Sequence, residues 1–159
     1  MKVAIVMGSK SDYDVVKKAE AVLDSFEVPY VTRVISAHRT PGAAASFAQH
    51  AEEDGIDVII AAAGKAAHLA GVLAGNTPLP VIGLPMKTSD LGGMDSLLSV
   101  VQMPKGVPVA TVAIGGAENA AYLAVQILSV REKGLREAFK AHKRKMEEEI
   151  LAIDKEISR

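Results

Sequence analysis

The chain contains the stretch Val31-Thr32-Arg33-Val34-Ile35-Ser36-Ala37-His38-Arg39-Thr40-Pro41, which passes from a strand-like run into the start of a helix. Its first five residues are mostly β-branched, as is typical of a strand. Thr40 before Pro41 matches an N-cap followed by the proline favoured at the first helical position. His38 and Arg39 therefore lie where a strand ends, which in open α/β sheets is the edge that binds ligands. A surface histidine in a turn is the alternative interpretation.

The same alternation of strand and helix recurs along the chain. It implies parallel strands joined by right-handed crossovers, and hence an α/β fold in the form of a three-layer sandwich. For five strands the common order is the flavodoxin-like 2-1-3-4-5. We expect a longer irregular region, typical of functional loops, over 88–108. The expected strands are 2–7, 30–35, 57–63, 80–84 and 109–114, and the expected helices are 13–26, 41–54, 66–75 and 118–128.

Composition restricts the class of protein. With 159 residues, 49% of them hydrophobic, the chain predicts a single domain over 1–159, with a catalytic core over 1–128. The net charge of -1 argues against nucleic acid as a partner. There is no cysteine, no signal-peptide pattern and no apolar run of the roughly 18 residues that a membrane helix needs. We therefore expect a cytoplasmic protein without a membrane partner.

The segment 129–159 predicts a long amphipathic helix for packing or oligomerisation. Its apolar positions recur at helical intervals, whereas lysines and glutamates occupy the other face. Such a stripe must be covered by the sheet layer or by a neighbouring subunit, so we expect a homo-oligomer. The stripe consists of Leu135, Phe139, His142, Met146, Ile150, Ile153 and Ile157.

The first strand is followed by Gly8-Ser9-Lys10-Ser11-Asp12, a flexible turn with two hydroxyls and a carboxylate at the start of a helix. Serines and helix N–H groups can donate hydrogen bonds to phosphate oxygens, and Asp12 can accept hydrogen bonds from sugar hydroxyls. The alternative is that Ser11 or Asp12 caps the helix. Neither a Walker motif nor G-x-G-x-x-G occurs here, which argues against a nucleoside triphosphate or a dinucleotide.

The third strand leads into Ala63-Gly64-Lys65-Ala66-Ala67-His68-Leu69-Ala70-Gly71, which carries a second histidine among small residues. Small side chains would let a planar ligand approach the backbone. Alternatively, they permit close helix packing, and His68 is a core or interface histidine. A zinc site with two histidines fits poorly, because catalytic zinc usually has three protein ligands.

Taken together, several motifs resemble the class I N5-carboxyaminoimidazole ribonucleotide mutases of purine biosynthesis, the PurE family. The resemblance covers about 3–128. It implies a flavodoxin-like fold, a homo-octamer, a small-molecule ribonucleotide substrate, and migration of a carboxylate from nitrogen to carbon without metal, nucleotide or biotin as cofactor. The motifs are Met7-Gly8-Ser9-Lys10-Ser11-Asp12, Ser36-Ala37-His38-Arg39-Thr40-Pro41, Ala66-Ala67-His68-Leu69 and 99–111.

The resemblance and the chemistry also suggest roles for the site residues. His38 can donate a proton to the carbamate nitrogen and later take one from the ring carbon, because imidazole changes charge near neutral pH. By resemblance, Ser9, Ser11, Asp12 and Arg39 hold the ribose phosphate. The residues implied for the ring and the carboxylate are Ser36, Gly64, Ala67, His68 and Leu69.

Two positions depart from the family pattern. Ala70 stands where proline is usual, and Lys65 stands where glycine or another small residue is common.

Two other functions are alternatives to the mutase. The first is that of a second class of the family, which carboxylates aminoimidazole ribonucleotide with free CO2; Arg39 and His68 favour the mutase. The second alternative is a flavodoxin-like nucleotide-binding module, which predicts tight nucleotide or flavin binding and no use for His38.

Overall fold

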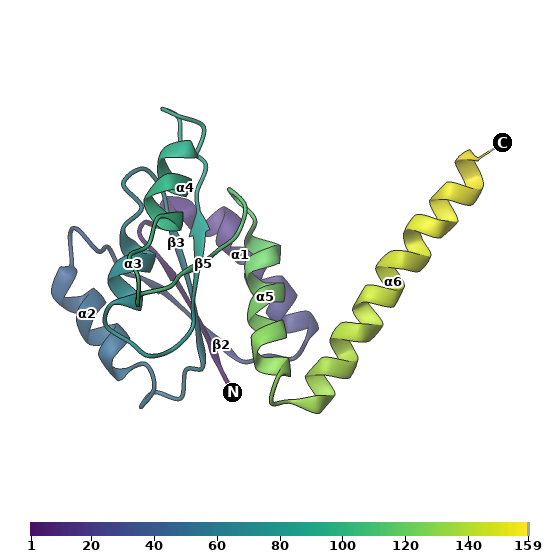
Figure 1. Cartoon of the computed structure of the whole chain (residues 1–159), viewed down its shortest axis with the longest axis horizontal. Coiled ribbons are helices and arrows are strands. Elements are labelled where there is room, and N and C mark those ends of the chain that lie inside the picture. The colour runs from purple at the N-terminus through teal and green to yellow at the C-terminus, as the bar shows by residue number, and fades with distance from the viewer. Residues whose placement is uncertain (159) are drawn as a thin grey trace.

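The structure, a computed structural model that describes residues 1–158, contains a five-stranded parallel sheet (Figure 1). Its strand order is β2-β1-β3-β4-β5. This confirms the predicted α/β class and the flavodoxin-like order. The strands are β1 (Val3–Met7), β2 (Tyr30–Val34), β3 (Val58–Ala63), β4 (Val81–Pro85) and β5 (Ala110–Thr111).

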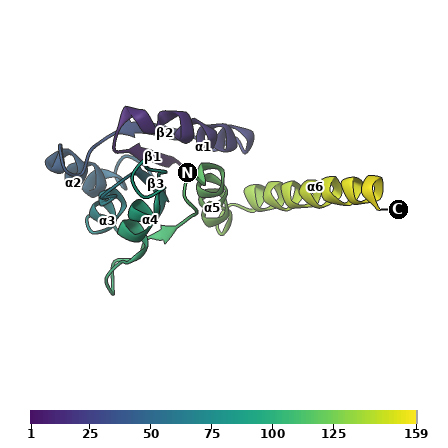
Figure 2. The ribbon, with the colours of Figure 1, turned by 90° about the horizontal axis from the view of Figure 1, so that it is seen from above.

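The helices cover both faces of this sheet (Figure 2). Because side chains alternate along a strand, β1 contributes Ile5 to one core and Val6 to the other. The first core also holds side chains of α1 (Tyr13–Ser25) and α5 (Ala117–Ser129). The second core holds side chains of α2 (Pro41–His50), α3 (Leu69–Ala74) and α4 (Met94–Val101).

Several predicted boundaries were too long. The second helix ends at His50, because turns that include Gly55 with a φ of +74° follow it. The third begins only at Leu69, since Lys65 adopts a φ of +56° and the following residues form a loop. The fifth strand pairs over Ala110–Thr111 alone.

The prediction of an irregular region over 88–108 missed helix α4. This helix starts after Gly93, whose φ is +100°, and the buried Ser96 hydroxyl donates to the Met86 carbonyl at 2.6 Å. Gly83 in β4 makes the packing of α4 possible: a Cβ atom there would lie 2.3 Å from Cγ1 of Val100. A short helix whose packing depends on a contact between distant residues has only a weak local signal in the sequence.

The last helix, α6 (Lys133–Ile157), is anchored only at its start and then projects away from the sheet (Figure 1). Leu135 is buried, and the Phe139 ring packs 5.9 Å from that of Phe26. Further along, Met146 and Ile150 are exposed, as are Ile153 and Ile157. The predicted apolar stripe is therefore present and largely uncovered in one chain. Of the helices within residues 1–158, none has both the length and the apolar composition to cross a membrane.

Candidate active site

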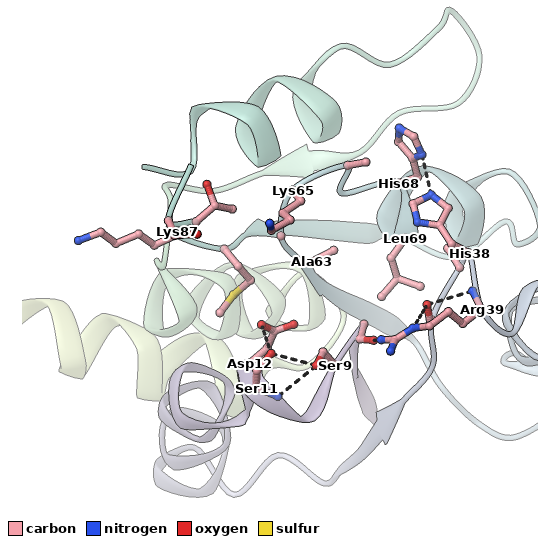
Figure 3. A pocket seen from close by; sticks show the side chains of 18 residues that line it. Ser9, Ser11, Asp12, His38, Arg39, Ala63, Lys65, His68, Leu69 and Lys87 are labelled. Carbon is pink, nitrogen blue, oxygen red and sulfur yellow. Dashed lines mark hydrogen bonds between the residues drawn. The ribbon is translucent and has the colours of Figure 1, made fainter. Parts of the chain in front are cut away.

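Hydroxyls, a carboxylate, a guanidinium and two histidines surround a cavity of about 530 Å3 at the carboxyl edge of the sheet (Figure 3). The loops after β1, β2, β3 and β4 all contribute to its wall. Of the predicted site residues, only Ala67 does not line the cavity, since it is 1% exposed and packs in the core. The others line the cavity: Ser9, Ser11, Asp12, Ser36, His38, Arg39, Gly64, His68 and Leu69.

The loop after β1 gathers the hydroxyls and the carboxylate. The Ser9 Oγ accepts hydrogen bonds from the Ser11 backbone N–H at 3.3 Å and from the Ser11 hydroxyl at 2.9 Å. Asp12 occupies the N-cap position of α1, but its carboxylate faces the Ser11 hydroxyl at 3.4 Å. Burial raises the pKa of Asp12, and the Ser11 hydrogen bond offsets part of this effect. A partly desolvated carboxylate of this kind is suited to accept hydrogen bonds from ligand hydroxyls.

The loop after β2 is closed by Thr40. Its Oγ1 accepts from the Ser36 N–H at 3.1 Å and donates to the Ser36 carbonyl at 2.9 Å. Thr40 is therefore the N-cap of α2 by position, as predicted, but its side chain binds the loop instead of the helix. The Arg39 guanidinium donates to the Gly8 carbonyl at 3.0 Å, and this places it beside the loop after β1.

His38 and His68 meet in the cavity although they come from different loops. His38 Nε2 lies 2.9 Å from His68 Nδ1, and the two rings are nearly perpendicular. One of these nitrogens must carry a proton and the other must accept it, so the contact holds one proton between two imidazoles. Both side chains are exposed, which contradicts the interpretation of His68 as a core histidine.

The sequence analysis missed the contribution of the β4–α4 loop to the cavity wall. Its base is fixed by Thr88, whose hydroxyl donates to the Asp95 carboxylate at 2.7 Å and accepts from the Gly93 N–H. The Thr88 hydrogen bond lowers the pKa of Asp95. The available signal was the irregular region itself, which was expected to be functional without assigned residues. The lining residues missed there are Met86, Lys87, Thr88 and Ser89.

The fold and the cavity together are those of an α/β protein whose site carries side chains suited to a small anionic molecule. Hydroxyls and a guanidinium lie on one side of this site, and a pair of histidines lies beside them. The family model described as AIR carboxylase matches residues 2–149, and the chain belongs to that family.

Similar proteins indicate which members of this family the chain resembles. The N5-carboxyaminoimidazole ribonucleotide mutase of Pyrococcus abyssi is 57% identical over 145 residues, which cover 91% of this chain and 83% of that protein. The mutase of Saccharolobus solfataricus is 52% identical over 151 residues, which cover 95% and 96%. The crystal structure of Treponema denticola PurE has a TM-score of 0.89 at 28% identity, covering 99% of both chains. These findings confirm the resemblance to the PurE mutases.

The Thr40 hydroxyl makes two hydrogen bonds to the Ser36 backbone across the loop that carries His38. We expect Thr40→Val, which removes both side-chain hydrogen bonds, to loosen the Ser36–Thr40 loop and to cost about 0.5–1.5 kcal/mol for each bond lost. Hydrogen exchange of a peptide covering 35–41 should become faster. Thr40→Ser keeps the hydroxyl and is the control. Equal exchange in the two variants would contradict the role of this side chain.

Proposed function

We propose that this protein converts N5-carboxyaminoimidazole ribonucleotide into 4-carboxy-5-aminoimidazole ribonucleotide in de novo purine biosynthesis. The observation that carries the proposal is the contact between His38 and His68 in the same cavity as Arg39. An acid-base group beside an anion-binding wall is what this reaction requires. The similarity to named mutases supports the choice of substrate.

The phosphate end of the substrate binds to the loops after β1 and β2. Two N–H groups of the Arg39 guanidinium donate to the Gly8 carbonyl and to the Ser36 hydroxyl. The remaining N–H groups can bind phosphate oxygens. The Ser9 and Ser11 hydroxyls and the first turn of α1 add neutral donors. Asp12 accepts hydrogen bonds from the ribose hydroxyls, which replace part of the hydration that its burial removes.

The imidazole ring and its carboxylate bind at the other end of the cavity. Ser36, Gly64, His68 and Leu69 all line the cavity, and Ser36 lies next to the Arg39 guanidinium. We assign Ala67 no ligand contact through its side chain, because it is buried in the core. The small residue Gly64 lets a flat ring approach the backbone.

A single histidine can carry out both proton transfers. His38 as an imidazolium donates a proton to the carbamate nitrogen, the nitrogen–carbon bond breaks with its electron pair left on nitrogen, and carbon dioxide is released in the cavity. Carbon 4 of the ring then attacks carbon dioxide, and neutral His38 takes the proton from that carbon. The imidazolium is regenerated, so the reaction consumes no net proton.

Confinement supplies the second part of the rate enhancement. Carbon dioxide held next to carbon 4 has a high effective concentration and reacts before it diffuses away. His68 keeps the His38 ring at a defined angle through the contact between His38 Nε2 and His68 Nδ1. The mechanism therefore requires one acid-base residue, one orienting partner and a closed cavity.

The reaction is tested by supplying the carboxylated substrate and, separately, the uncarboxylated ribonucleotide with bicarbonate. We expect product from the first mixture at bicarbonate concentrations where the second gives almost none. The reverse result would assign the protein to the carboxylases that use free CO2. In the first assay, His38→Asn should lower kcat by about 100-fold or more.

The exposed His50, whose Nδ1 contacts the Ser46 carbonyl on α2 away from the cavity, provides the matched control. His50→Asn should retain the parent kcat. Circular dichroism and ligand binding should stay unchanged in both histidine variants, since neither side chain belongs to the core. Parent-like turnover by His38→Asn would refute the assignment of the acid-base residue.

Binding of the phosphate can be separated from the chemistry. Arg39→Ala should weaken binding of the uncarboxylated ribonucleotide by about tenfold or more, because charge-assisted hydrogen bonds are lost. For the dephosphorylated nucleoside the loss should be much smaller. Calorimetric titration measures both affinities. Lys10→Ala removes a nearby exposed cation that lies outside the cavity wall and should bind both ligands like the parent. Equal losses for both ligands would show that Arg39 does not bind phosphate.

We also propose that the protein is a homo-octamer. Besides the exposed apolar side chains of α6, a second exposed row lies on and before α4, formed by Leu91, Met94, Leu98 and Val101. Soluble monomers rarely expose such rows, so contacts between subunits should cover them. Light scattering of the active enzyme should give eight times the chain mass. A monomer mass at micromolar concentration in active enzyme would refute the proposal.

A further inference from the structure

An ion pair joins two of the loops that wall the cavity. The Lys65 ammonium, on the loop after β3, lies 2.7 Å from the Asp90 carboxylate on the β4–α4 loop. Lys65 lines the cavity, yet 70% of its side chain is exposed, as is 58% of that of Asp90. The pair therefore lies at the rim of the cavity, with Lys65 on the wall and Asp90 just outside it.

At their bases the two loops are joined by the Met86 N–H, which donates to the Ala63 carbonyl at 2.9 Å. Hydrogen bonds of Thr88 and Ser96 fix the base of the β4–α4 loop to its own helix. The Ser99 hydroxyl on α4 approaches the Lys65 carbonyl at 3.5 Å, but it also donates to the Asp95 backbone carbonyl at 2.7 Å. The tip that carries Asp90 is thus tied to the opposite loop chiefly by the Lys65 ammonium.

The backbone at Lys65 supports a functional reason for this contact. Its φ of +56° lies in the left-handed region, where a side chain with a Cβ atom costs energy relative to glycine. Such strain tends to persist where the surroundings hold a residue in place, often at functional sites. At Lys65 the side chain makes the ion pair, and the backbone carbonyl lies 3.5 Å from the Ser99 hydroxyl.

The proposed reaction gives closure of this rim a chemical purpose. Carbon dioxide is small and uncharged, so Arg39 and the histidines cannot hold it as they would hold an anion. Its retention depends on the walls of the cavity and on how rarely they open. An exposed ion pair is weak enough to break when substrate enters or product leaves, and it re-forms without a large rearrangement.

We propose that Lys65 and Asp90 are positioning residues whose ion pair closes the rim of the cavity and keeps the released carbon dioxide beside the ring until it is captured. This inference rests on the proposed mutase function. Neither residue donates or accepts the proton in the reaction. Removal of either charge should therefore increase the escape of carbon dioxide, with a smaller effect on the chemical step.

The test follows the substrate carboxylate in water that contains 13C-labelled bicarbonate and carbonic anhydrase. The parent enzyme should make mostly unlabelled product, because the original carboxylate is transferred before it mixes with the labelled pool. In Asp90→Asn and Lys65→Met, release of uncarboxylated ribonucleotide and uptake of label should rise by roughly two- to five-fold. The double variant should match the single ones, since the same contact is lost. Spontaneous loss of the carbamate is subtracted with an enzyme-free sample.

Conservative and remote variants serve as controls. Asp90→Glu and Lys65→Arg keep the charges and should retain label exclusion close to the parent. Asp14→Asn breaks a similarly exposed pair with Lys17 on α1, where the two atoms are 2.7 Å apart, and should have no effect.

The possible outcomes distinguish the two proposals. If the parent makes no product from the carboxylated substrate, the proposed function fails. If it makes product and the variants exclude label as well as the parent does, only the closure by Lys65 and Asp90 is refuted. Closure is also refuted if the parent's product is fully labelled. The inference is also overturned if Lys65→Met binds substrate weakly while Asp90→Asn binds it as well as the parent does. That result would show that Lys65 contacts the substrate.

Discussion

The common register of the central strands is the constraint on which the rest of this structure depends. Met7 at the end of β1 is paired with Val34 on one side and with Ala62 on the other, so three strands end at one level. The ladder continues into the loops, where the Gly8 N–H donates to the Ala62 carbonyl at 3.0 Å. Loops that leave a parallel sheet at one edge must converge, and their side chains then share one cavity.

Small residues let the layers approach closely enough for this arrangement. The face of β3 that meets α2 and α3 carries Ala61 and Ala63, and Gly83 in β4 leaves room for the Val100 side chain of α4. Close packing of this kind fixes where the helix and the loop before it lie, because a larger side chain would displace both. The location of the β4–α4 loop at the cavity is thus set by the core as well as by its own turns.

The walls of the cavity carry different kinds of side chain. The loops after β1 and β2 supply donors for an anion, with Arg39 held against Gly8 at 3.0 Å. The histidine contact holds one proton between two imidazoles, and the exposed ion pair of Lys65 with Asp90 joins two of the loops at the rim. An anion can be held by charge, whereas a neutral intermediate can be held only by closure. In the proposed reaction, the Arg39 side of the cavity would therefore bind the anionic substrate, and the Lys65–Asp90 side would retain the neutral carbon dioxide.

The sequence by itself determined the five strands, the helices that follow four of them and nine of the eighteen residues that line the cavity. The runs of β-branched residues and the junction motifs that mark them are local signals. The strand order was expected only because it is the common one for five strands. Tertiary structure alone decided the contact between His38 and His68, thirty positions apart, and the ion pair of Lys65 with Asp90. It also decided that Ala67 faces the core, that α4 forms, and that α6 leaves its stripe uncovered. Periodicity describes which face a residue takes on its own element. Which residues of other elements it then meets depends on strand register and layer packing, which no local pattern encodes.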